Sequence, residues 1–520
     1  MRNEHCGTVI AVDIGTTAVK ILAVDGGGRV RASHSIDYPL NTPKPGYAEQ
    51  DPDLLFESVV KGVRTVMDRS GIDPGDVLCV SFSAAMHSLI GLDGDNRPIT
   101  PCITWADTRS AAVAERLRRD GSGLEFYKST GTPIHPMSPL VKLIWLKERE
   151  PELHASVRRW VGIKEYVFAR LFGRFVIDYS LASATGLFNL EKLDWHDEAL
   201  AAAGLTRDRL SEPAPTTSVM TGLSAEYARA MGLRPDTPFV VGASDGVLAN
   251  LGTGAVEPGV TAVTIGTSGA VRSVVDRPAF DPEGRLFCYA LTDRLWVIGG
   301  AVNNGGIVLR WACDNLFAAE TEAARLAGEE PYDRLVRLAQ EAPIGAGGLL
   351  FLPLLTGERA PYWNADARGV FFGFSLRHDV RHALRALLEG VVLQIGAVAR
   401  LLEQAGGKAR ETRASGGFAR SPFLRQMLAD ALGTPVRVTH TVESSGLGAA
   451  WLGLHAIGAE PDISAVGRWI AFDASGAHEP NPEAHEAYRR LAGMTAALYE
   501  SLKDRFGEFA ALQSSFSSEG

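Results

Sequence analysis

The chain has 520 residues, of which 46% are hydrophobic and 22% are charged, so it carries enough apolar material for two or three separate cores. Its net charge is −9 and it has no block of lysine and arginine, which excludes a basic stripe for binding a nucleic-acid backbone. It has neither a signal-like apolar start nor an apolar run of ~20 residues, so we expect a cytoplasmic protein without a membrane segment.

The cysteines indicate a reducing compartment. They are odd in number, scattered along the chain and never spaced as CxxC, so they predict neither a disulfide framework nor a zinc knuckle. The five are Cys6, Cys79, Cys102, Cys288 and Cys313.

The first predicted element is a β-hairpin. Residues 8–13 and 18–25 are rich in β-branched side chains and are separated by a Gly-Thr-Thr turn. A dinucleotide-binding fold would instead follow its first strand with GxGxxG and a helix, so a Rossmann dehydrogenase is disfavoured. A helix is predicted over residues 54–68, with Asp51 as its cap and Gly71 after its end.

A buried strand is predicted over residues 239–244, and Asp245 follows it directly. A carboxylate in this position is suited to accept the proton of a hydroxyl that attacks a phosphoryl group. An Asp-Gly pair is also typical of a turn or a helix cap, and the local sequence leaves both interpretations open.

An internal repeat indicates two similar domains. Residues 11–25 are echoed by residues 262–276 with one insertion, about half a chain later. We expect the domain boundary within residues 252–259 and a ligand between the two glycine turns. Any Gly-Thr hairpin between valine-rich strands has this appearance, which is the alternative explanation for a single copy.

Three further elements follow along the chain. Residues 379–404 carry apolar side chains at helical spacing and predict a largely buried helix. A second helix should begin at Ser421 and Pro422 and end at Gly433. The serine-rich residues 513–520 are expected to fray.

The first glycine turn has the groups that a phosphate needs. Gly15 permits a tight turn that directs backbone N–H groups to one point, and Thr16, Thr17 and Lys20 add donors. No Walker sequence occurs, so phosphate binding would depend on hairpin turns. Asp13 could hold Mg²⁺ through water. The second copy, Thr264-Ile-Gly-Thr-Ser268, has a hydroxyl where the first has the acid and would clamp phosphate oxygens.

These motifs together resemble the FGGY family of carbohydrate kinases, and the similarity covers nearly the whole chain. The motifs that carry the resemblance, in order, are Asp13-Ile-Gly-Thr-Thr17, Glu49-Gln-Asp-Pro52, Trp105-Ala-Asp-Thr-Arg109, Gly242-Ala-Ser-Asp-Gly246, Asn304-Gly-Gly-Ile-Val-Leu-Arg-Trp311, Gly357-Glu-Arg-Ala-Pro-Tyr-Trp363, Ala367-Arg-Gly-Val-Phe-Phe-Gly-Phe374 and Ser415-Gly-Gly-Phe-Ala-Arg-Ser421.

The resemblance implies an α/β fold of two ribonuclease H-like domains of the actin and sugar-kinase type, with mixed sheets flanked by helices and an active-site cleft between them. We expect an N-terminal domain over residues 1–253, which binds the sugar, and a C-terminal domain over 254–505, which binds the nucleotide, with a tail over 506–520.

The resemblance also implies ATP and Mg²⁺ as cofactors, Asp245 as catalytic base and Asp13 at the metal. Expected phosphate and nucleotide contacts are Asp13, Gly15, Thr16, Thr17, Lys20, Gly266, Thr267, Gly305, Gly306, Gly416, Gly417 and Ser421. Expected substrate contacts are Met86, His87, Trp105, Asp107, Lys164 and Asp245. His87 is also compatible with a buried structural histidine and Trp105 with a core aromatic residue.

The substrate is expected to be gluconate, phosphorylated at its terminal hydroxyl. Residues 81–88, 130–137, 162–166 and 178–185 look like the gluconokinases of this family, where xylulose kinases usually have Gly-Gln-Met-His and Pro-Lys-Asp. A gluconate site should offer a cation to the carboxylate, for which Lys164, Arg109 and His87 are the candidates. Lys164 is equally compatible with a structural or solvated charge.

Two alternatives stay open from the sequence. A xylulose kinase or another pentulose or polyol kinase shares the core motifs, and a non-catalytic ATP-driven clamp shares the actin-like fold. The partners expected in either enzyme are a sugar acid or polyol and a nucleotide. The oligomeric state is not determined by the sequence, which allows a homodimer.

Overall fold

The computed structural model describes residues 7–439 and 443–517, and two compact units divide them. The first unit consists of residues 7–257, Val274–Ile298 and Glu443–Ile470. The second consists of Pro258–Ser273 and residues 299–439 and 471–517.

A mixed six-stranded sheet forms the centre of the first unit. Its order is β13 (Val219–Met220), β14 (Phe239–Ser244), β5 (Val77–Ala84), β1 (Thr8–Ile14), β2 (Ala18–Asp25) and β3 (Val30–Asp37). The predicted hairpin is confirmed, because β1 pairs antiparallel with β2, while β5 is parallel to both β1 and β14.

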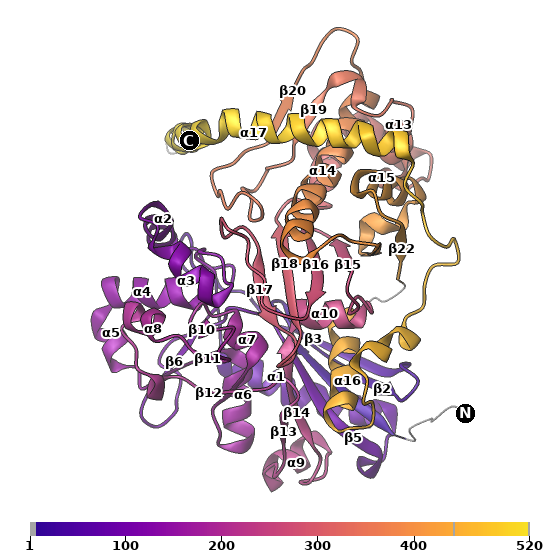
Figure 1. Cartoon of the computed structure of the whole chain (residues 1–520). Helices are drawn as coiled ribbons and strands as arrows, with labels where there is room; N and C mark the ends of the chain where they lie inside the picture. Colours follow the sequence, from indigo (N-terminus) through magenta and orange to yellow (C-terminus); the bar gives the residue numbers. More distant parts are fainter. Residues whose placement is uncertain (1–6, 440–442, 518–520) are drawn as a thin grey trace. The chain divides into compact units, whose positions relative to one another are not determined.

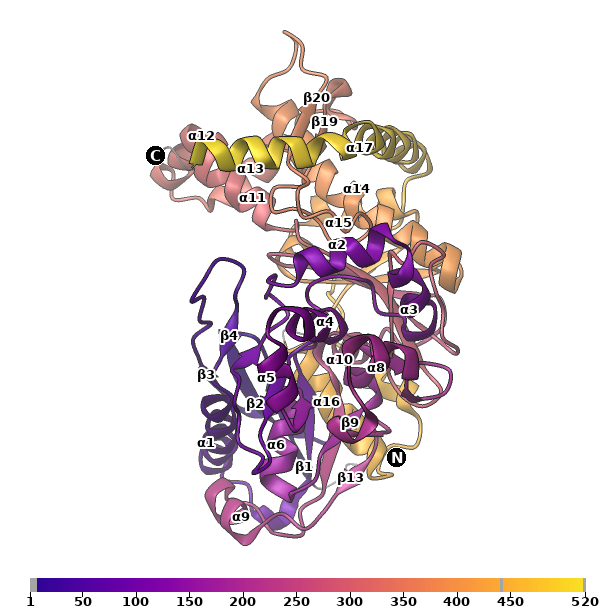
Figure 2. The ribbon, with the colours of Figure 1, turned by 90° about the vertical axis from the view of Figure 1, so that its left-hand side faces the viewer.

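Alternation along β1 explains why both faces of this sheet are covered by helices. Ile10 and Val12 belong to the core on one face, whereas Val9 and Ala11 belong to the core on the other, as expected for a period of two. Helix α1 (Pro52–Ser70) covers the first face and α16 (Ser444–Ala456) covers the second (Figures 1 and 2).

Helix α1 shows how well local signals define an end. The Asp51 side chain accepts hydrogen bonds from the N–H groups of Asp53 and Leu54, and Gly71 ends the helix with a φ of 63°. The predicted helix is thus confirmed and is two residues longer at each end.

The first unit contains further short strands and helices around this sheet. The strands are β4 (Glu49–Gln50), β6 (Ile90–Leu92), β7 (Cys102–Ile103), β8 (Arg159–Val161), β9 (Val176–Asp178), β10 (Phe188–Asn189), β11 (Asp194–Trp195) and β12 (Glu212–Ala214). The helices are α2 (Ala111–Arg119), α3 (Ser122–Thr130), α4 (Pro139–Arg149), α5 (Pro151–Ser156), α6 (Ile163–Phe172), α7 (Tyr179–Ser183), α8 (Asp197–Ala203), α9 (Ala225–Met231) and α10 (Asp245–Gly252).

A second six-stranded sheet repeats this pattern. Its order is β17 (Phe287–Ala290), β18 (Trp296–Val302), β16 (Gly269–Val275), β15 (Val260–Ile265), β21 (Glu411–Ser415) and β22 (Val436–Val438). β15 is antiparallel to β16 and parallel to β21, as β1 is to β2 and β5. The hairpin expected from the internal repeat is therefore present a second time.

The helices of the second unit include α14 (Val380–Gly406), the long buried helix that the sequence predicted. α15 (Pro422–Leu432) starts after Ser421, whose side chain makes no capping bond, and ends at Gly433 with a φ of 68°. The remaining elements are β19 (Leu350–Leu352), β20 (Val370–Phe372), α11 (Ile307–Trp311), α12 (Ala318–Leu326), α13 (Pro331–Gln340) and α17 (Pro482–Ser517).

The expectation that residues 513–520 fray is wrong for its first part. Helix α17 continues through Ser517 as it runs across β19, α14 and α15 (Figure 1), and residues 518–520 lie outside the described residues. The apolar side chains of Tyr499 and Phe506 anchor it on Leu352 and Leu354, which a count of serines does not reveal.

No helix among the described residues is long and apolar enough to cross a membrane. Cys79, Cys102, Cys288 and Cys313 are buried free thiols, and Cys6 lies outside the described residues.

Candidate active site

Asp245 lies where β14 gives way to α10. It is half-buried, its Oδ1 accepts a hydrogen bond of 2.6 Å from the N–H of Gly246, and its backbone carbonyl accepts one of 3.2 Å from Ser445 Oγ. The strand therefore ends in a carboxylate that is not sealed in the interior, as a base for a substrate hydroxyl requires.

Asp13 lies at the same edge of the sheet. β1, β5 and β14 are parallel neighbours, so the carboxyl ends of β1 and β14 face the same way, with only β5 between them. The register pairs Asp13 with Ser83 of β5. The topology thus brings both carboxylates to one edge of one sheet.

The environment of Asp13 fits a hard cation. Burial raises the pKa of its carboxyl, and the negative charge of Glu443 raises it further. The Ser83 hydroxyl and Lys20 lower this pKa and offset part of the shift. Its Oδ1 is buried and has no hydrogen-bond partner among the described residues. An oxygen in this state can bind Mg²⁺ or one of its waters, which would satisfy it. Within the described chain, no group of three or more His, Cys, Asp and Glu side chains is arranged to hold a metal.

The first glycine turn is braced by hydrogen bonds from neighbouring residues. The N–H of Gly15 donates to the carbonyl of Ala18 over 3.0 Å, and its own carbonyl accepts from Tyr38 Oη over 2.5 Å. Trp105 Nε1 donates to Thr16 Oγ1 over 2.8 Å, whereas Thr17 is exposed. The turn is therefore held rigid while a threonine side chain stays accessible to a phosphate.

Lys20 has a different partner from the expected phosphate. Its Nζ lies 2.9 and 3.0 Å from the two carboxylate oxygens of Glu443, the residue before α16. The pair is only partly buried, so the ammonium can also exchange to an anion of higher charge. Its phosphate contact stays a prediction.

The expected substrate residues divide into a surface group and a buried group. Met86 and Trp105 line one small hollow together with Thr16, and Trp105 is 38% exposed. His87 is 8% exposed and hydrogen-bonds through Nδ1 to the carbonyl of Ala184 over 2.7 Å. Asp107 has no exposed surface, so any effect it has on a substrate passes through its neighbours.

Asp107 and Arg109 form a buried ion-pair cluster. Arg109 Nη2 lies 2.7 Å from Asp107 Oδ2 and also contacts Glu49, and the guanidinium stacks 3.7 Å from the centre of the Tyr47 ring. The guanidinium already faces two carboxylates, so a third from a substrate would meet a net negative site.

Lys164 is paired in the interior. Its Nζ lies 2.8 Å from Asp178 Oδ2 and donates to the carbonyl of Ala243 over 3.2 Å, and the residue is 1% exposed. Burial lowers the pKa of Lys164, and the carboxylates of Asp178, Glu165 and Asp245 act against that shift. The ammonium therefore holds the end of β14, the strand that leads into Asp245. A direct contact of Lys164 with a substrate carboxylate is disfavoured.

A cavity of about 960 Å³ lies entirely within the second unit. This size is within the range of ~300–1,000 Å³ typical of ligand sites. Six of the expected nucleotide residues line it: Gly266, Thr267, Gly305, Gly306, Gly417 and Ser421. Gly416 directly precedes the lining residue Gly417, with a φ of 91°.

Matches to family models decide what these two sites belong to. The model of the N-terminal domain of the FGGY family of carbohydrate kinases matches residues 8–252, and the model of its C-terminal domain matches residues 261–457. The chain belongs to the FGGY family of carbohydrate kinases.

Similar proteins cover this FGGY kinase almost from end to end. A gluconokinase of Bacillus subtilis (strain 168) is 46% identical over 97% of this chain and 98% of its own. Two solved structures from Lactobacillus acidophilus, a gluconate kinase and a ligand-bound xylulose kinase, are each 36% identical with a TM-score of 0.91. Both cover 97% of this chain, and 99% and 100% of their own chains respectively. The predicted family, the two-domain α/β fold and the kinase class are confirmed.

Three expectations stay predictions for this FGGY kinase: the domain bounds at residues 253 and 505, the roles of the individual site residues, and the cleft between the domains.

Sequence reasoning missed several lining residues of the cavity in this FGGY kinase. Tyr332, Arg337 and Gln340 of α13 line it and belong to none of the motifs. Arg310 of α11 also lines it; it lies within the motif of residues 304–311 but was not among the expected nucleotide contacts. The amphipathic spacing of residues 331–340 could have predicted a helix there, but not which ligand site it faces.

Lys142 of α4 was also missed in this FGGY kinase. Its buried Nζ donates to the carbonyls of His87 and Thr104 over 2.8 and 2.7 Å, and burial lowers the pKa of Lys142 to about 7. It thereby ties together the two segments that carry His87 and Trp105. A lysine within an apolar helix was the available signal.

Replacing Lys164 with Met should affect all acceptors alike in this FGGY kinase. The change leaves Asp178 buried without its partner and should cost about 3–5 kcal/mol of stability. We expect kcat to fall by a similar factor for gluconate and for a neutral polyol, because Lys164 supports Asp245 and does not contact the carboxylate. Steady-state kinetics on both acceptors measure this.

The double variant Lys164→Met/Asp178→Asn removes both charges and is the control, in which much of the lost stability should return. A rise in KM for gluconate without a rise for the neutral polyol would contradict this and would show that Lys164 contacts the gluconate carboxylate directly.

Proposed function

We propose that this kinase transfers the γ-phosphoryl group of ATP to the terminal hydroxyl of D-gluconate, giving 6-phospho-D-gluconate and ADP. The observation that carries the proposal is the 46% identity, over 97% of the chain, to a protein named gluconokinase. We also propose that the reaction takes place in the cytoplasm.

The proposed roles follow from the chemistry of phosphoryl transfer. Asp245 accepts the proton of the attacking hydroxyl, for which a half-buried carboxylate at the end of a strand is well placed. Met86 and Trp105 offer an apolar wall to the carbon chain of the acceptor. The remaining catalysis is positioning and neutralisation of charge.

The nucleotide is proposed to lie in the cavity of the second unit. The backbone N–H groups of its glycine turns are suited to phosphate oxygens, and Leu387, Leu388 and Val391 of α14 line an apolar part that suits a base. Mg²⁺ would be held by Asp13 and would offset the charge of the triphosphate.

The cation that would recognise the gluconate carboxylate is proposed to be His87. The two other candidates, Lys164 and Arg109, are engaged by Asp178 and by Asp107 and Glu49. His87 Nδ1 donates its proton to the carbonyl of Ala184, which fixes the orientation of the imidazole ring.

A xylulose kinase is the second candidate, since the xylulose kinase of Lactobacillus acidophilus is as similar in fold and identity as the gluconate kinase. Side-by-side turnover on gluconate, xylulose, ribulose and glycerol, followed by release of ADP, separates the two. We expect kcat/KM for gluconate to exceed that for each neutral acceptor by at least about tenfold. A higher value for xylulose would overturn the gluconate assignment and leave the kinase class intact.

A further inference from the structure

Two turns, at residues 266–267 and 305–306, pack closely against each other in the wall of the nucleotide cavity of the second unit. The N–H of Gly305 donates to the carbonyl of Thr267 over 3.2 Å, and that of Gly306 donates to the carbonyl of Gly266 over 2.6 Å. A Cβ on Gly305 would lie 2.7 Å from the carbonyl oxygen of Ser268, so the turns fit only with glycine there. The shape of the phosphate-binding surface depends on this contact.

Glu358 lies behind the second of these turns. Its side chain is buried, and Oε1 accepts from the N–H groups of Asn303 and Arg359 over 2.5 and 2.9 Å. Oε2 accepts from Asn304 Nδ2 over 2.9 Å. One carboxylate thus holds two consecutive residues that lead directly into Gly305.

The loop that carries Glu358 holds Asn304 from a second side. Asn304 Nδ2 also donates to the carbonyl of Gly357 over 2.8 Å, and Asn304 Oδ1 accepts from the N–H and Oγ1 of Thr356 over 3.3 and 3.2 Å. Asn304 has no exposed surface, so these groups are the substitutes for water that a buried amide requires.

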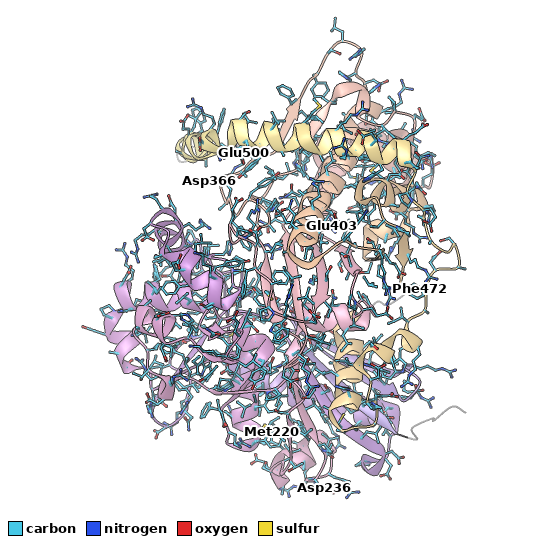
Figure 3. The ribbon with its side chains drawn as sticks, viewed as in Figure 1. Met220, Asp236, Asp366, Glu403, Phe472 and Glu500 are labelled. Atoms are coloured by element: carbon cyan, nitrogen blue, oxygen red, sulfur yellow. The ribbon has the colours of Figure 1, made fainter. Side chains whose placement is uncertain are left out.

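Helix α17 supports this loop from outside. The rings of Tyr362 and Tyr499 stack with centres 3.6 Å apart, and Asn364 Nδ2 donates to Tyr499 Oη over 3.3 Å. Figure 3 labels Asp366 and Glu500, which mark where the end of the loop passes α17. The loop that carries the Glu358 carboxylate is therefore held in place by α17, independently of its bonds to Asn303 and Asn304.

We propose that Glu358 is a positioning residue for the nucleotide: its carboxylate holds Asn303 and Asn304 so that Gly305 and Gly306 meet Gly266 and Thr267 in a phosphate-binding arrangement. Glu358 does not line the cavity, so it acts through the turn and not by contact with the ligand. This inference depends on the nucleotide site proposed above.

The ionisation of Glu358 gives the proposal a distinctive pH dependence. Burial raises its pKa to about 7, against the hydrogen bonds from Asn304, Asn303 and Arg359. Below pH 7 the carboxyl becomes protonated and loses acceptor capacity, so the turn is held less firmly and the nucleotide should bind more weakly. The titratable and charged groups around it are Arg359 and Tyr362 of the same loop and Tyr499 of α17, with Arg400 of α14 and Glu500 of α17 acting on Tyr362.

The test compares ADP binding by the wild type and by Glu358→Gln, using calorimetry from pH 6 to pH 8.5. Glutamine keeps one acceptor oxygen, but its NH₂ group replaces the oxygen that accepts from Asn304 Nδ2, so two donors would face each other. At pH 8 we therefore expect the Kd for ADP to rise roughly 5- to 30-fold. The protonation of ADP is common to both proteins, so the ratio of their Kd values isolates Glu358 and should shrink as the pH falls below 7. The KM for ATP should rise while that for gluconate stays unchanged.

Glu322→Gln is the matched control, since this carboxylate of α12 is 59% exposed, and its Kd for ADP should change by no more than about twofold. If Glu358→Gln does not fold, Thr356→Val decides: it removes the part-buried hydroxyl bond to Asn304 Oδ1 and should raise the Kd for ADP by about three- to tenfold, above the limit set by the control. Unchanged Kd values with unchanged pH dependence would overturn the positioning role alone, whereas a wild type that binds no ADP would overturn the proposed nucleotide site itself.

Discussion

Replacing Asp245 with Asn should lower kcat by about 10²–10⁴-fold, because the amide cannot accept the proton of the attacking hydroxyl. The KM for ATP should change little, since the nucleotide cavity lies wholly in the other unit and Asn has the size of Asp. Steady-state kinetics with gluconate, followed by release of ADP, measure both constants.

The control for this variant is Asp236→Asn. Asp236 is exposed and pairs only at the surface with Arg234, so kcat should stay within about twofold of the wild type (Figure 3). Turnover by Asp245→Asn near the wild-type value would remove Asp245 from the role of catalytic base.

Replacing Gly242 with Ala should strongly destabilise the first unit. Gly242 has a φ of 76° and interrupts the pairing of β14 with β5, and a Cβ there would lie 1.7 Å from the carbonyl oxygen of Phe82. The backbone must move, three residues before Asp245, so we expect a loss of about 3–5 kcal/mol. Thermal unfolding followed by circular dichroism should show Tm lowered by more than about 5 °C.

Gly71→Ala separates the clash from the cost of the backbone conformation. Gly71 also has a positive φ, of 63°, but a Cβ there would have no atom of the described residues within 4 Å, so the loss should be only about 1 kcal/mol. Equal losses at the two positions would show that the close approach to Phe82 contributes nothing.

The sequence was sufficient for elements whose signals are local. The hairpin of β1 and β2 followed from alternating β-branched residues, and α1 from a capping Asp51 and a closing Gly71. The second hairpin followed from the internal repeat, because the same strand-turn-strand unit needs the same residue pattern. Of the six expected nucleotide residues that line one cavity, Gly266 and Thr267 lie in the glycine turn of the internal repeat, whereas Gly305, Gly306, Gly417 and Ser421 came from family motifs.

What the sequence could not predict depends on contacts between distant segments. Helix α16, which covers the first sheet, comes from residues 444–456, and no periodicity indicates which sheet a helix covers. The sequence left Lys164 open as either a substrate contact or a structural charge, and only the fold shows that Asp178 lies beside it. Glu358 formed part of a motif, but its role required the position of Asn304.

The most direct test of the whole account is a crystal structure of the protein with ADP, Mg²⁺ and gluconate. We predict the phosphates of ADP on the turns at residues 266–267 and 305–306, and the terminal hydroxyl of gluconate within about 2.6–3.2 Å of the Asp245 carboxylate. Gluconate bound with its carboxylate end toward Asp245, or ADP bound outside the cavity of the second unit, would contradict the account.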